Sequence, residues 1–383
     1  MAINVSLQQL LSSPTITRVI SRVKTPQTRL QEFFGMQPGG PATNPAGGSV
    51  HAYDIFDKTR KLATGRSRGT GPATIAPNKV GQITVTLYRS HEKIPLLDEK
   101  LFRTRPLGSN WGNVDARGMA YITKQEEYLA QRFKNMREFM CAQLFKGGFG
   151  ISFSGEDVVP VAIDAGHKNV EYFGPSNEHN GQTSSAIPGL TIGGQADIIG
   201  ASWATASTDI INDVLQINAG FEEVHGRPFR HVWLNSTTFA PLMENTQLAS
   251  AAGSANTIFN NFGPTDYRSI DGIPDTGLEF IFKAIPWLKW HIYDAGLDVN
   301  GTFTKFFPDN YAAFCPDPSS DWAEWVEGSE IVRENLMDQG SERFGMTAWT
   351  TPCIDPSGFE LKALDNGIPC LYVPKCLAYA KIS

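Results

Sequence analysis

The stretch TKQEEYLAQRFKNMREFMCAQLFKGG, residues 123–148, predicts the element around which the rest of the chain is arranged. Thr123 and Glu126 form a capping box behind Ile122, and Gly147-Gly148 stop the pattern. Between these ends, apolar residues recur at steps of four, three, four and four, which places them on one helix face: Leu129, Phe133, Met136, Met140 and Leu144. We therefore expect a long amphipathic helix lying along one side of a sheet. Its opposite face is expected to be open to solvent or to a lumen and bears Lys124, Gln131, Lys134 and Glu138.

The residues before this helix predict a long β-hairpin. Apolar and polar residues alternate over 51–63 and again over 82–94, and a loop rich in Gly and Arg joins the two stretches. In the second stretch Ile83, Val85 and Leu87 share one face, so the other face is wet or partnered. A two-stranded ribbon is marginally stable alone, so this hairpin needs a surface to lie on.

The first fifty residues predict an arm. Gly, Pro and Asn dominate 37–48, a composition that compact elements do not tolerate. The apolar anchors are too sparse for a core of their own, so we expect them to lie on other subunits: Leu10, Leu11, Val19, Ile20, Phe33 and Phe34.

Helix and strand patterns alternate after the long helix. A helix is expected near 207–224, because Ile210, Val214, Ile217 and Phe221 share a face and Gly226 ends the run. A third helix is expected to begin near Ser236. Expected strands lie at 151–153, 158–163, 231–234, 278–282, 289–293, 302–307 and 311–314, and an exposed loop at 174–194. Together these elements predict a turn-rich α+β protein.

Composition limits the classes of function. At 383 residues the chain exceeds one average domain, so about two or three packed units are expected. The formal net charge of -6 argues against tight nucleic-acid binding, which needs clustered Lys and Arg. Residues 1–14 lack the pattern of a signal peptide, and Lys283 and Lys289 interrupt the apolar stretch 280–290, so no membrane span is expected.

Motifs for catalysis, cofactors and metals are missing. There is no G-x-S-x-G elbow or P-loop, and the seven histidines lack metal-ligand spacing. Asp294, Asp298 and Asn300 before Gly301 fit a hairpin turn better than a calcium loop. The odd number of cysteines and the absence of CxxC predict buried reduced thiols at Cys141, Cys315, Cys353, Cys370 and Cys376. We expect no enzyme, no cofactor and no metal site.

Charge is segregated along the chain. Six basic residues stand against Asp57 alone over 57–79, namely Lys58, Arg60, Lys61, Arg66, Arg68 and Lys79. Nine acids stand against Arg333 alone over 309–342, namely Asp309, Asp317, Asp321, Glu324, Glu327, Glu330, Glu334, Asp338 and Glu342. The acids are either a solvated face or the partner of the basic hairpin on a neighbouring subunit, where opposite charges would steer assembly.

The order of arm, basic hairpin, long helix and mixed domain resembles the Hong Kong 97-type capsid fold, with its N-arm, E-loop, spine helix and A-domain. More specifically, the chain resembles the lambda-type major capsid protein E family over almost its whole length. The residues that carry this resemblance are 79–89, 135–138, 144–147, Trp203 before 209–210, 305–311, 350–356, 368–374 and 380–382. Within 305–311, Pro308, Asp309 and Asn310 are expected to form an architectural turn, because Pro fixes φ and Asp and Asn bond to nearby backbone.

The resemblance implies a domain plan and a role. The plan is an N-terminal arm at 1–50, an E-loop hairpin at 51–105, a P-domain with spine helix at 106–200, an A-domain at 201–344, and C-terminal strands at 345–383 that return to the P-domain. The role is that of a tailed-bacteriophage major capsid protein, whose hexamers and pentamers enclose double-stranded DNA in an icosahedral head.

The resemblance also implies partners and a location. Implied partners are other copies, a portal protein, a separately encoded scaffolding protein, a decoration protein and packaged DNA read without sequence specificity. The implied location is the virion capsid, assembled in the host cytoplasm. Two alternatives stay open: an encapsulin-like cellular nanocompartment shell of the same fold, and a cytosolic α+β hydrolase.

Overall fold

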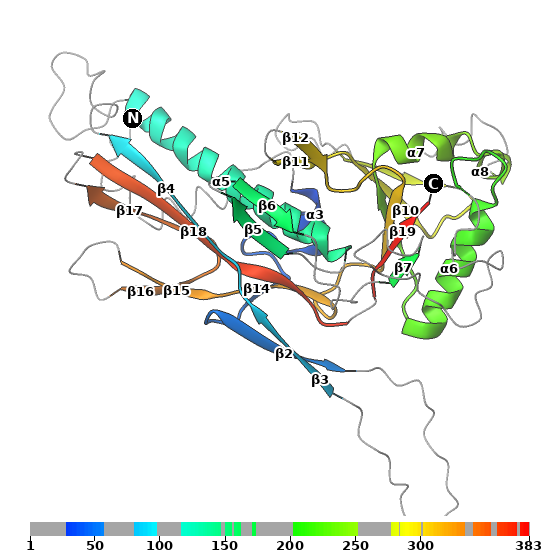
Figure 1. Ribbon diagram of the computed structural model, residues 1–383, viewed down its shortest axis with the longest axis horizontal. Helices are drawn as coiled ribbons and strands as arrows, with labels where there is room; N and C mark the ends of the chain where they lie inside the picture. Colours follow the sequence, from blue (N-terminus) through cyan, green and yellow to red (C-terminus); the bar gives the residue numbers. More distant parts are fainter. Residues whose placement is uncertain are drawn as a thin grey trace, which may run out of the picture.

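A computed structural model of the protein describes residues 28–56, 80–97, 116–146, 150–154, 157–161, 171–173, 202–251, 277–282, 284–299, 302–333, 340–353, 358–373 and 376–382. Helices and strands mix as an α+β protein, with two main sheets at opposite ends of the body and a long helix on the first (Figure 1).

The first sheet has five strands, built on the 14-residue strand β18 (Gly358–Leu371). The beginning of β18 pairs antiparallel with both β4 (Arg89–Leu97) and β17 (Thr347–Cys353). Its end pairs with β14 (Ala323–Glu327), which in turn pairs in parallel with β1 (Thr43–Pro45). We call this the long sheet.

Helix α5 (Ala116–Leu144) runs along the long sheet (Figure 1). Leu129 and Phe133 on its apolar stripe are buried with Leu96 of β4 and Leu361 of β18. The short helix α3 (Arg29–Phe34) then packs on α5.

The second sheet has six strands among the described residues, in the order β7-β19-β13-β8-β10-β9. Their bounds are β7 (Glu171–Phe173), β19 (Ala378–Lys381), β13 (Tyr311–Cys315), β8 (His231–Leu234), β10 (Lys289–Tyr293) and β9 (Gly277–Ile281). Helices α6 (Ile210–His225), α7 (Ser236–Met243) and α8 (Thr246–Ala251) lie beside it and bury an apolar core with it (Figure 1).

Four two-stranded ribbons complete the described chain. They are β2 (Val50–Phe56) with β3 (Val80–Thr86), β5 (Gly150–Ser154) with β6 (Asp157–Val161), β11 (Gly296–Val299) with β12 (Thr302–Lys305), and β15 (Ser329–Val332) with β16 (Ser341–Phe344). The β2–β3 ribbon projects away from the body (Figure 1).

Several sequence predictions are confirmed. The helix expected at 207–224 is α6, which Asp209 caps through its side chain and which Gly226 ends in the left-handed region at φ 70°. The expected helix start near Ser236 is the start of α7. Strands β8 and β10 coincide with their predicted ranges, and β11 and β12 form the expected hairpin. Four of the five cysteines are buried.

The predicted start of the long helix is wrong. Helix α5 begins at Ala116, so Thr123 is an exposed residue inside it and not its cap. Residues 116–122 include the good helix formers Ala and Met, and Ile122 is fully buried against the long sheet. Tertiary packing therefore extends the helix past a capping-box pattern that would end it in isolation.

The predicted return strand of the hairpin is divided between two partners. Residues 80–86 pair with β2, whereas residues 89–97 pair with β18. At the break, the Leu87 amide donates to the Ser49 carbonyl at 2.9 Å, and the Gly367 amide donates to the Tyr88 carbonyl at 2.9 Å. The ribbon is thus anchored in the long sheet by its own continuation.

The expected position of Phe33 and Phe34 on other subunits is also wrong. Phe34 is 4% exposed, within the chain's own core, and Phe33 packs against the same cluster. The other anchors of the predicted arm, at 10, 11, 19 and 20, lie outside the described residues.

The polar face of α5 is only partly open. Lys124 and Gln131 are exposed as expected, but Lys134 is 6% and Glu138 0% exposed. The reason is α3, which covers the C-terminal half of α5. Arg137, next to Glu138 on α5, is also fully buried and donates to both carboxylate oxygens of Asp365 at 2.6 Å.

No helix in the part of the chain that the structure describes is long and apolar enough to cross a membrane.

We expect Arg137→Met to lower the free energy of unfolding by about 3–5 kcal/mol, because Asp365 would keep a buried charge without its partner. The control is Arg132→Met, which removes a bidentate pair with Glu92 whose arginine is 45% exposed. That change should cost less than about 1 kcal/mol. Urea denaturation of both variants measures the difference, and equal losses would contradict the role given to Arg137.

Candidate functional site

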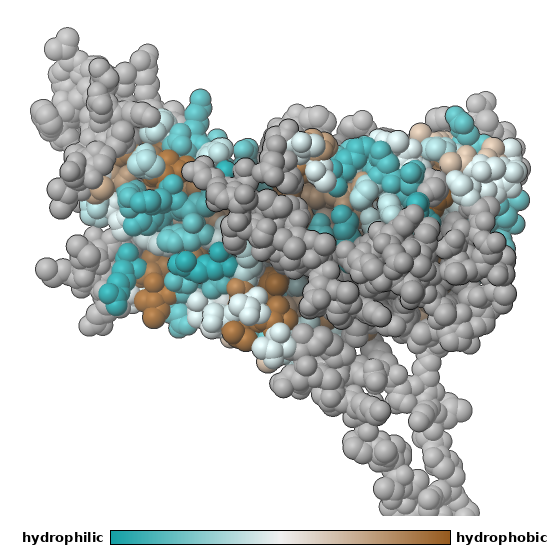
Figure 2. Space-filling model, viewed as in Figure 1, coloured by the Kyte–Doolittle hydropathy of each residue, from teal (hydrophilic) through white to brown (hydrophobic). Residues whose placement is uncertain are grey.

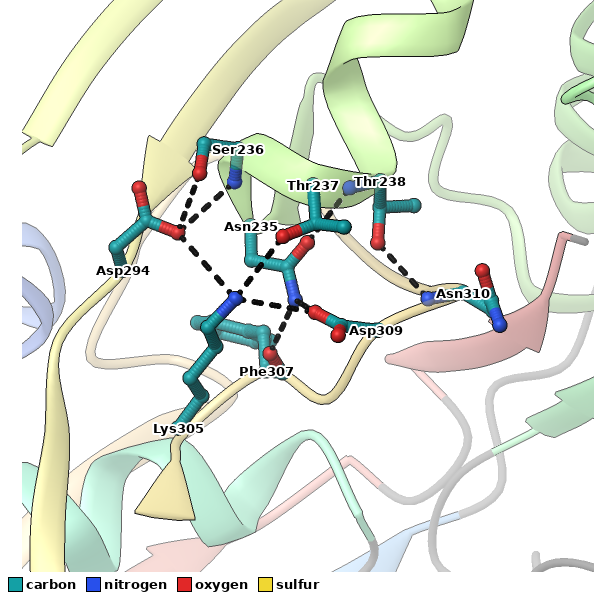
Figure 3. Close-up of polar contacts among 9 residues, drawn as sticks. All are labelled: Asn235, Ser236, Thr237, Thr238, Asp294, Lys305, Phe307, Asp309 and Asn310. Atoms are coloured by element: carbon teal, nitrogen blue, oxygen red, sulfur yellow. Dashed lines mark hydrogen bonds and ion pairs between the residues drawn. The ribbon is translucent and has the colours of Figure 1, made fainter. Parts of the chain in front are cut away.

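The turn predicted at Pro308, Asp309 and Asn310 lies between β12 and β13, where it meets the start of α7 (Figure 3). Asn310 has φ 72°, and it is the one non-glycine residue of the described chain in the left-handed region. Its amide donates to the Thr238 side-chain oxygen at 2.8 Å. Its carbonyl accepts from the Ile382 amide at 2.8 Å, so the turn also holds the C-terminal end of the chain.

Asn235 joins this turn to α7 (Figure 3). Its side-chain oxygen caps α7 by accepting from the Thr238 amide at 2.8 Å. Its side-chain nitrogen donates to the Phe307 carbonyl at 2.9 Å and to Asp309 Oδ1 at 2.6 Å. One fully buried amide thus satisfies two backbone groups and one carboxylate.

Lys305 neutralises the acids around the turn. Its Nζ lies 3.1 Å from Asp309 Oδ1 and 4.0 Å from Asp294 Oδ1, and it donates to Thr237 at 3.1 Å. The hydrogen bond from Lys305 holds the pKa of the Asp309 carboxyl below its usual value. Asp294 in turn accepts from the amide and hydroxyl of Ser236.

This network binds protein groups to one another. Each of its acids accepts hydrogen bonds from within the chain, and its lysine donates to Asp309 and lies within ion-pair distance of Asp294. The arrangement holds the start of α7, the turn at 308–310 and the residue after β10 together, and both acids are bonded to groups of the chain itself. Across the residues that the structure covers, no group of three or more His, Cys, Asp or Glu side chains is placed to hold a metal ion.

The other predicted site residues fall outside the network. Lys58, Arg60, Lys61, Arg66, Arg68 and Lys79 all lie outside the described residues. Most of the described acids of 309–342 bond within the chain: Asp309 with Lys305, Asp317 with His231, Glu324 with Asn44 and Tyr372, Glu327 with Arg137, and Glu330 with Arg89. Asp321 and Glu342 are exposed, whereas Glu334 and Asp338 lie outside the described part.

An apolar face is exposed on the β15–β16 ribbon. Ile331 is 67% and Phe344 41% exposed, and the strand register places both on the same side of the ribbon. The other side carries Val332, which is buried with Trp349 and Leu364. On the face shown in Figure 2, hydrophobic side chains gather below the long helix, over β14–β16. We call Ile331 and Phe344 the apolar ribbon face.

Two buried polar clusters between α3 and the body were not predicted from the sequence. Glu138 accepts from Tyr293, and His291 bonds to His231. The polar residues of α5 follow the pattern of an exposed helix face. They are buried because a second helix, α3, packs over them. A signal for this was the apolar pair Phe33-Phe34, which needed a core nearby.

No protein-family model matches the sequence, and no curated protein is significantly similar to it. Solved structures do share the fold. A phage-related protein from Bordetella bronchiseptica RB50 aligns over 97% of this chain and 97% of its own, with a TM-score of 0.50 and 10% identity. A protein described as a prophage capsid protein, from E. coli CFT073, aligns over 97% of this chain and 99% of its own, with a TM-score of 0.53 and 12% identity. The fold is the α+β Hong Kong 97-type capsid fold that the order of elements predicted.

Asn310→Val should cost about 1–3 kcal/mol of unfolding free energy, because a β-branched residue is strained at positive φ. Asn310→Gly, which adopts this conformation freely, should lose less. Thermal unfolding of the two variants compares them. If valine were tolerated as well as glycine, the turn would not depend on its backbone conformation.

Proposed function

We propose that the chain is the major capsid protein of a tailed bacteriophage, which assembles into the hexamers and pentamers of an icosahedral head enclosing double-stranded DNA. One observation carries this proposal: a capsid-type fold is shared over nearly the whole of this chain and of the prophage capsid protein. A shell subunit acts through its contacts and needs no catalytic step, so we propose no enzymatic activity.

Within this class we propose membership of the lambda-type protein E family. The ordered motifs at 79–89, 135–147, 305–311 and 368–382 support it. The proposed partners are a portal protein, a separately encoded scaffolding protein, a decoration protein and DNA. The proposed location is the virion capsid after assembly in the host cytoplasm.

The proposed domain plan keeps the arm, E-loop, P-domain and A-domain, with adjusted limits. Strands β7 and β19 join the A-domain in this plan, because they pair within the six-stranded sheet. Strand β14 pairs with β18 in the long sheet, and β13 pairs with β8 in the six-stranded sheet. We therefore place the end of the A-domain between β13 and β14, near residue 317, and assign β14 to β17 to the P-domain.

The apolar ribbon face is the surface that we assign to contact with another copy. A ribbon with its inner side packed and its outer side apolar is poorly suited to water. In a closed shell the partner of this face would be a second copy of the chain, because symmetry repeats the same contact between neighbouring copies. Glu342 lies on the same side as Ile331, which gives the contact a charge as well as an apolar centre.

The purified chain should form closed shells in negative-stain images, and Ile331→Asp should lower the assembled fraction by roughly tenfold or more, since a carboxylate would be buried at each contact. The control is Phe303→Asp, which charges a residue 54% exposed on β12, and this variant should still assemble. Circular dichroism checks that both variants fold. Normal shells from Ile331→Asp would remove the ribbon face from the proposal. No shells from any form, either alone or with the proposed scaffolding protein, would remove the capsid role.

The basic hairpin is proposed to steer assembly toward exposed acids of a neighbour. Changing Lys58, Arg60, Lys61, Arg66, Arg68 and Lys79 to Gln should slow assembly by about tenfold and flatten its dependence on salt. Light scattering at low and high ionic strength measures both effects. The control, Lys124→Gln with Arg333→Gln, removes exposed charge from the body and should leave the salt dependence intact. An unchanged assembly rate in the variant with all six substitutions would contradict the steering role.

A further inference from the structure

Helix α3 is fixed on one side by a buried carboxylate. Glu138 of α5 is fully buried, and both of its oxygens accept two hydrogen bonds. Oε1 accepts from the Leu30 amide at 2.7 Å and from the Tyr293 hydroxyl at 2.7 Å. Oε2 accepts from the Gln31 amide at 3.1 Å and from the Gln31 side chain at 3.0 Å. Three of the four donors belong to α3, so docking of this helix encloses the carboxylate.

The other side of α3 rests on a buried imidazole. His291 of β10 is 4% exposed, and its Nδ1 lies 3.5 Å from a guanidinium nitrogen of Arg29. Its Nε2 lies 2.8 Å from Nδ1 of His231, and Nε2 of His231 lies 3.1 Å from Asp317. Phe33 of α3 meets the His291 ring edge to face, with centroids 5.7 Å apart.

The geometry favours a neutral His291 while α3 is docked. A guanidinium can only donate, so Nδ1 of His291 must accept from Arg29, and its proton is then on Nε2, pointing to His231. A second proton on Nδ1 would face the positive charge of Arg29. Protonation of His291 therefore opposes docking, whereas ionisation of Glu138 opposes it by placing a charge in a site closed to water.

We propose that α3 is a latch with two opposing titrations, Glu138 on one side and His291 on the other, which cancel and keep the helix docked across mildly acidic pH. This device is internal to one chain and goes beyond the proposed capsid function, so it stands or falls separately from shell formation. Release of α3 would separate residues 28–35 from the body.

The sign of each titration follows from linkage. Burial raises the pKa of Glu138 from 4.5 to about 7 despite its four donors, so docking strengthens as pH falls from about 7 to 4.5. Burial, together with the charges of His231, Arg29 and Lys289, lowers the pKa of His291 well below 6.5. Docking therefore weakens as pH falls below 6.5. The two effects have opposite slopes between about 4.5 and 6.5, where they offset each other.

The other charged or titratable groups around α3 do not replace this pair. On α5, burial lowers the pKa of Lys134 only to about 8, and Arg137 is bound to Asp365. Burial raises the pKa of Cys141 on α5 and of Tyr293 on β10, away from this range. His231 and Asp317 extend the chain of hydrogen bonds beyond His291, and Arg29 and Glu32 are carried by α3 itself.

Hydrogen exchange of the full chain, read by mass spectrometry over 28–36 and corrected for intrinsic exchange at each pH, tests the latch. In the parent protein, protection should change little between pH 5 and 6.5, within about threefold. Glu138→Gln should lose protection as pH falls, and His291→Gln should gain it, each approaching about tenfold per pH unit. The double variant should be flat again. Peptides from α6 serve as the control and should follow none of these trends.

Slopes of the same sign in the two single variants, or two flat profiles, would overturn the proposal. If Glu138→Gln loses protection in α6 as well, and so fails to fold, Tyr293→Phe provides the second variant. It removes one donor from the ionised carboxylate, so protection over 28–36 should keep falling as pH rises above about 7. A Tyr293→Phe profile identical to the parent would also overturn the latch.

Discussion

The buried guanidinium of Arg137 is the contact on which the rest of the molecule depends. It forms a bidentate pair with Asp365 at 2.6 Å, lies 3.4 Å from Glu327, and sits over the ring of Trp325 at 4.5 Å. These partners belong to β18 and β14, so a single side chain fixes α5 on the long sheet. A buried charge that lost this geometry would destabilise the fold strongly, and the sheet and helix are therefore committed to one register.

The two sheets are joined by a shared core that α3 completes. Leu30 and Phe34 of α3 are buried with Phe145 beyond α5, Trp233 of β8 and Trp322 before β14. Phe34 meets Trp322 edge to face at 5.7 Å, and Phe33 meets Trp233 at 5.1 Å. Because these aromatic rings come from both halves of the molecule, the halves form one body whose closure requires the N-terminal segment.

This arrangement separates a well-packed body from two ribbons at its surface. The core, the Arg137–Asp365 pair and the bond between Asn235 and the turn at 308–310 hold the body together. The β2–β3 ribbon projects from the body, and the β15–β16 ribbon exposes an apolar side (Figure 1). The proposed role in a shell would use this combination, because the body of such a subunit must keep one shape while its projections meet several neighbours. The proposed contacts accordingly lie on ribbons, and the buried charges lie inside.

The sequence by itself determined the α+β class, the order of elements, helix α6, strands β8 and β10, and the long helix with its apolar stripe, because periodicity and helix stops are local. It placed the turn at 308–310 for the same reason. Only the tertiary structure decided that the return strand divides at Leu87, that α5 begins at Ala116, and that Lys134 and Glu138 are buried. Those outcomes depend on pairing with β18 and on covering by α3, residues that are distant in sequence. From the sequence, a polar side chain on a helix is expected to be exposed. Only the tertiary structure shows whether another segment covers it and supplies its hydrogen bonds.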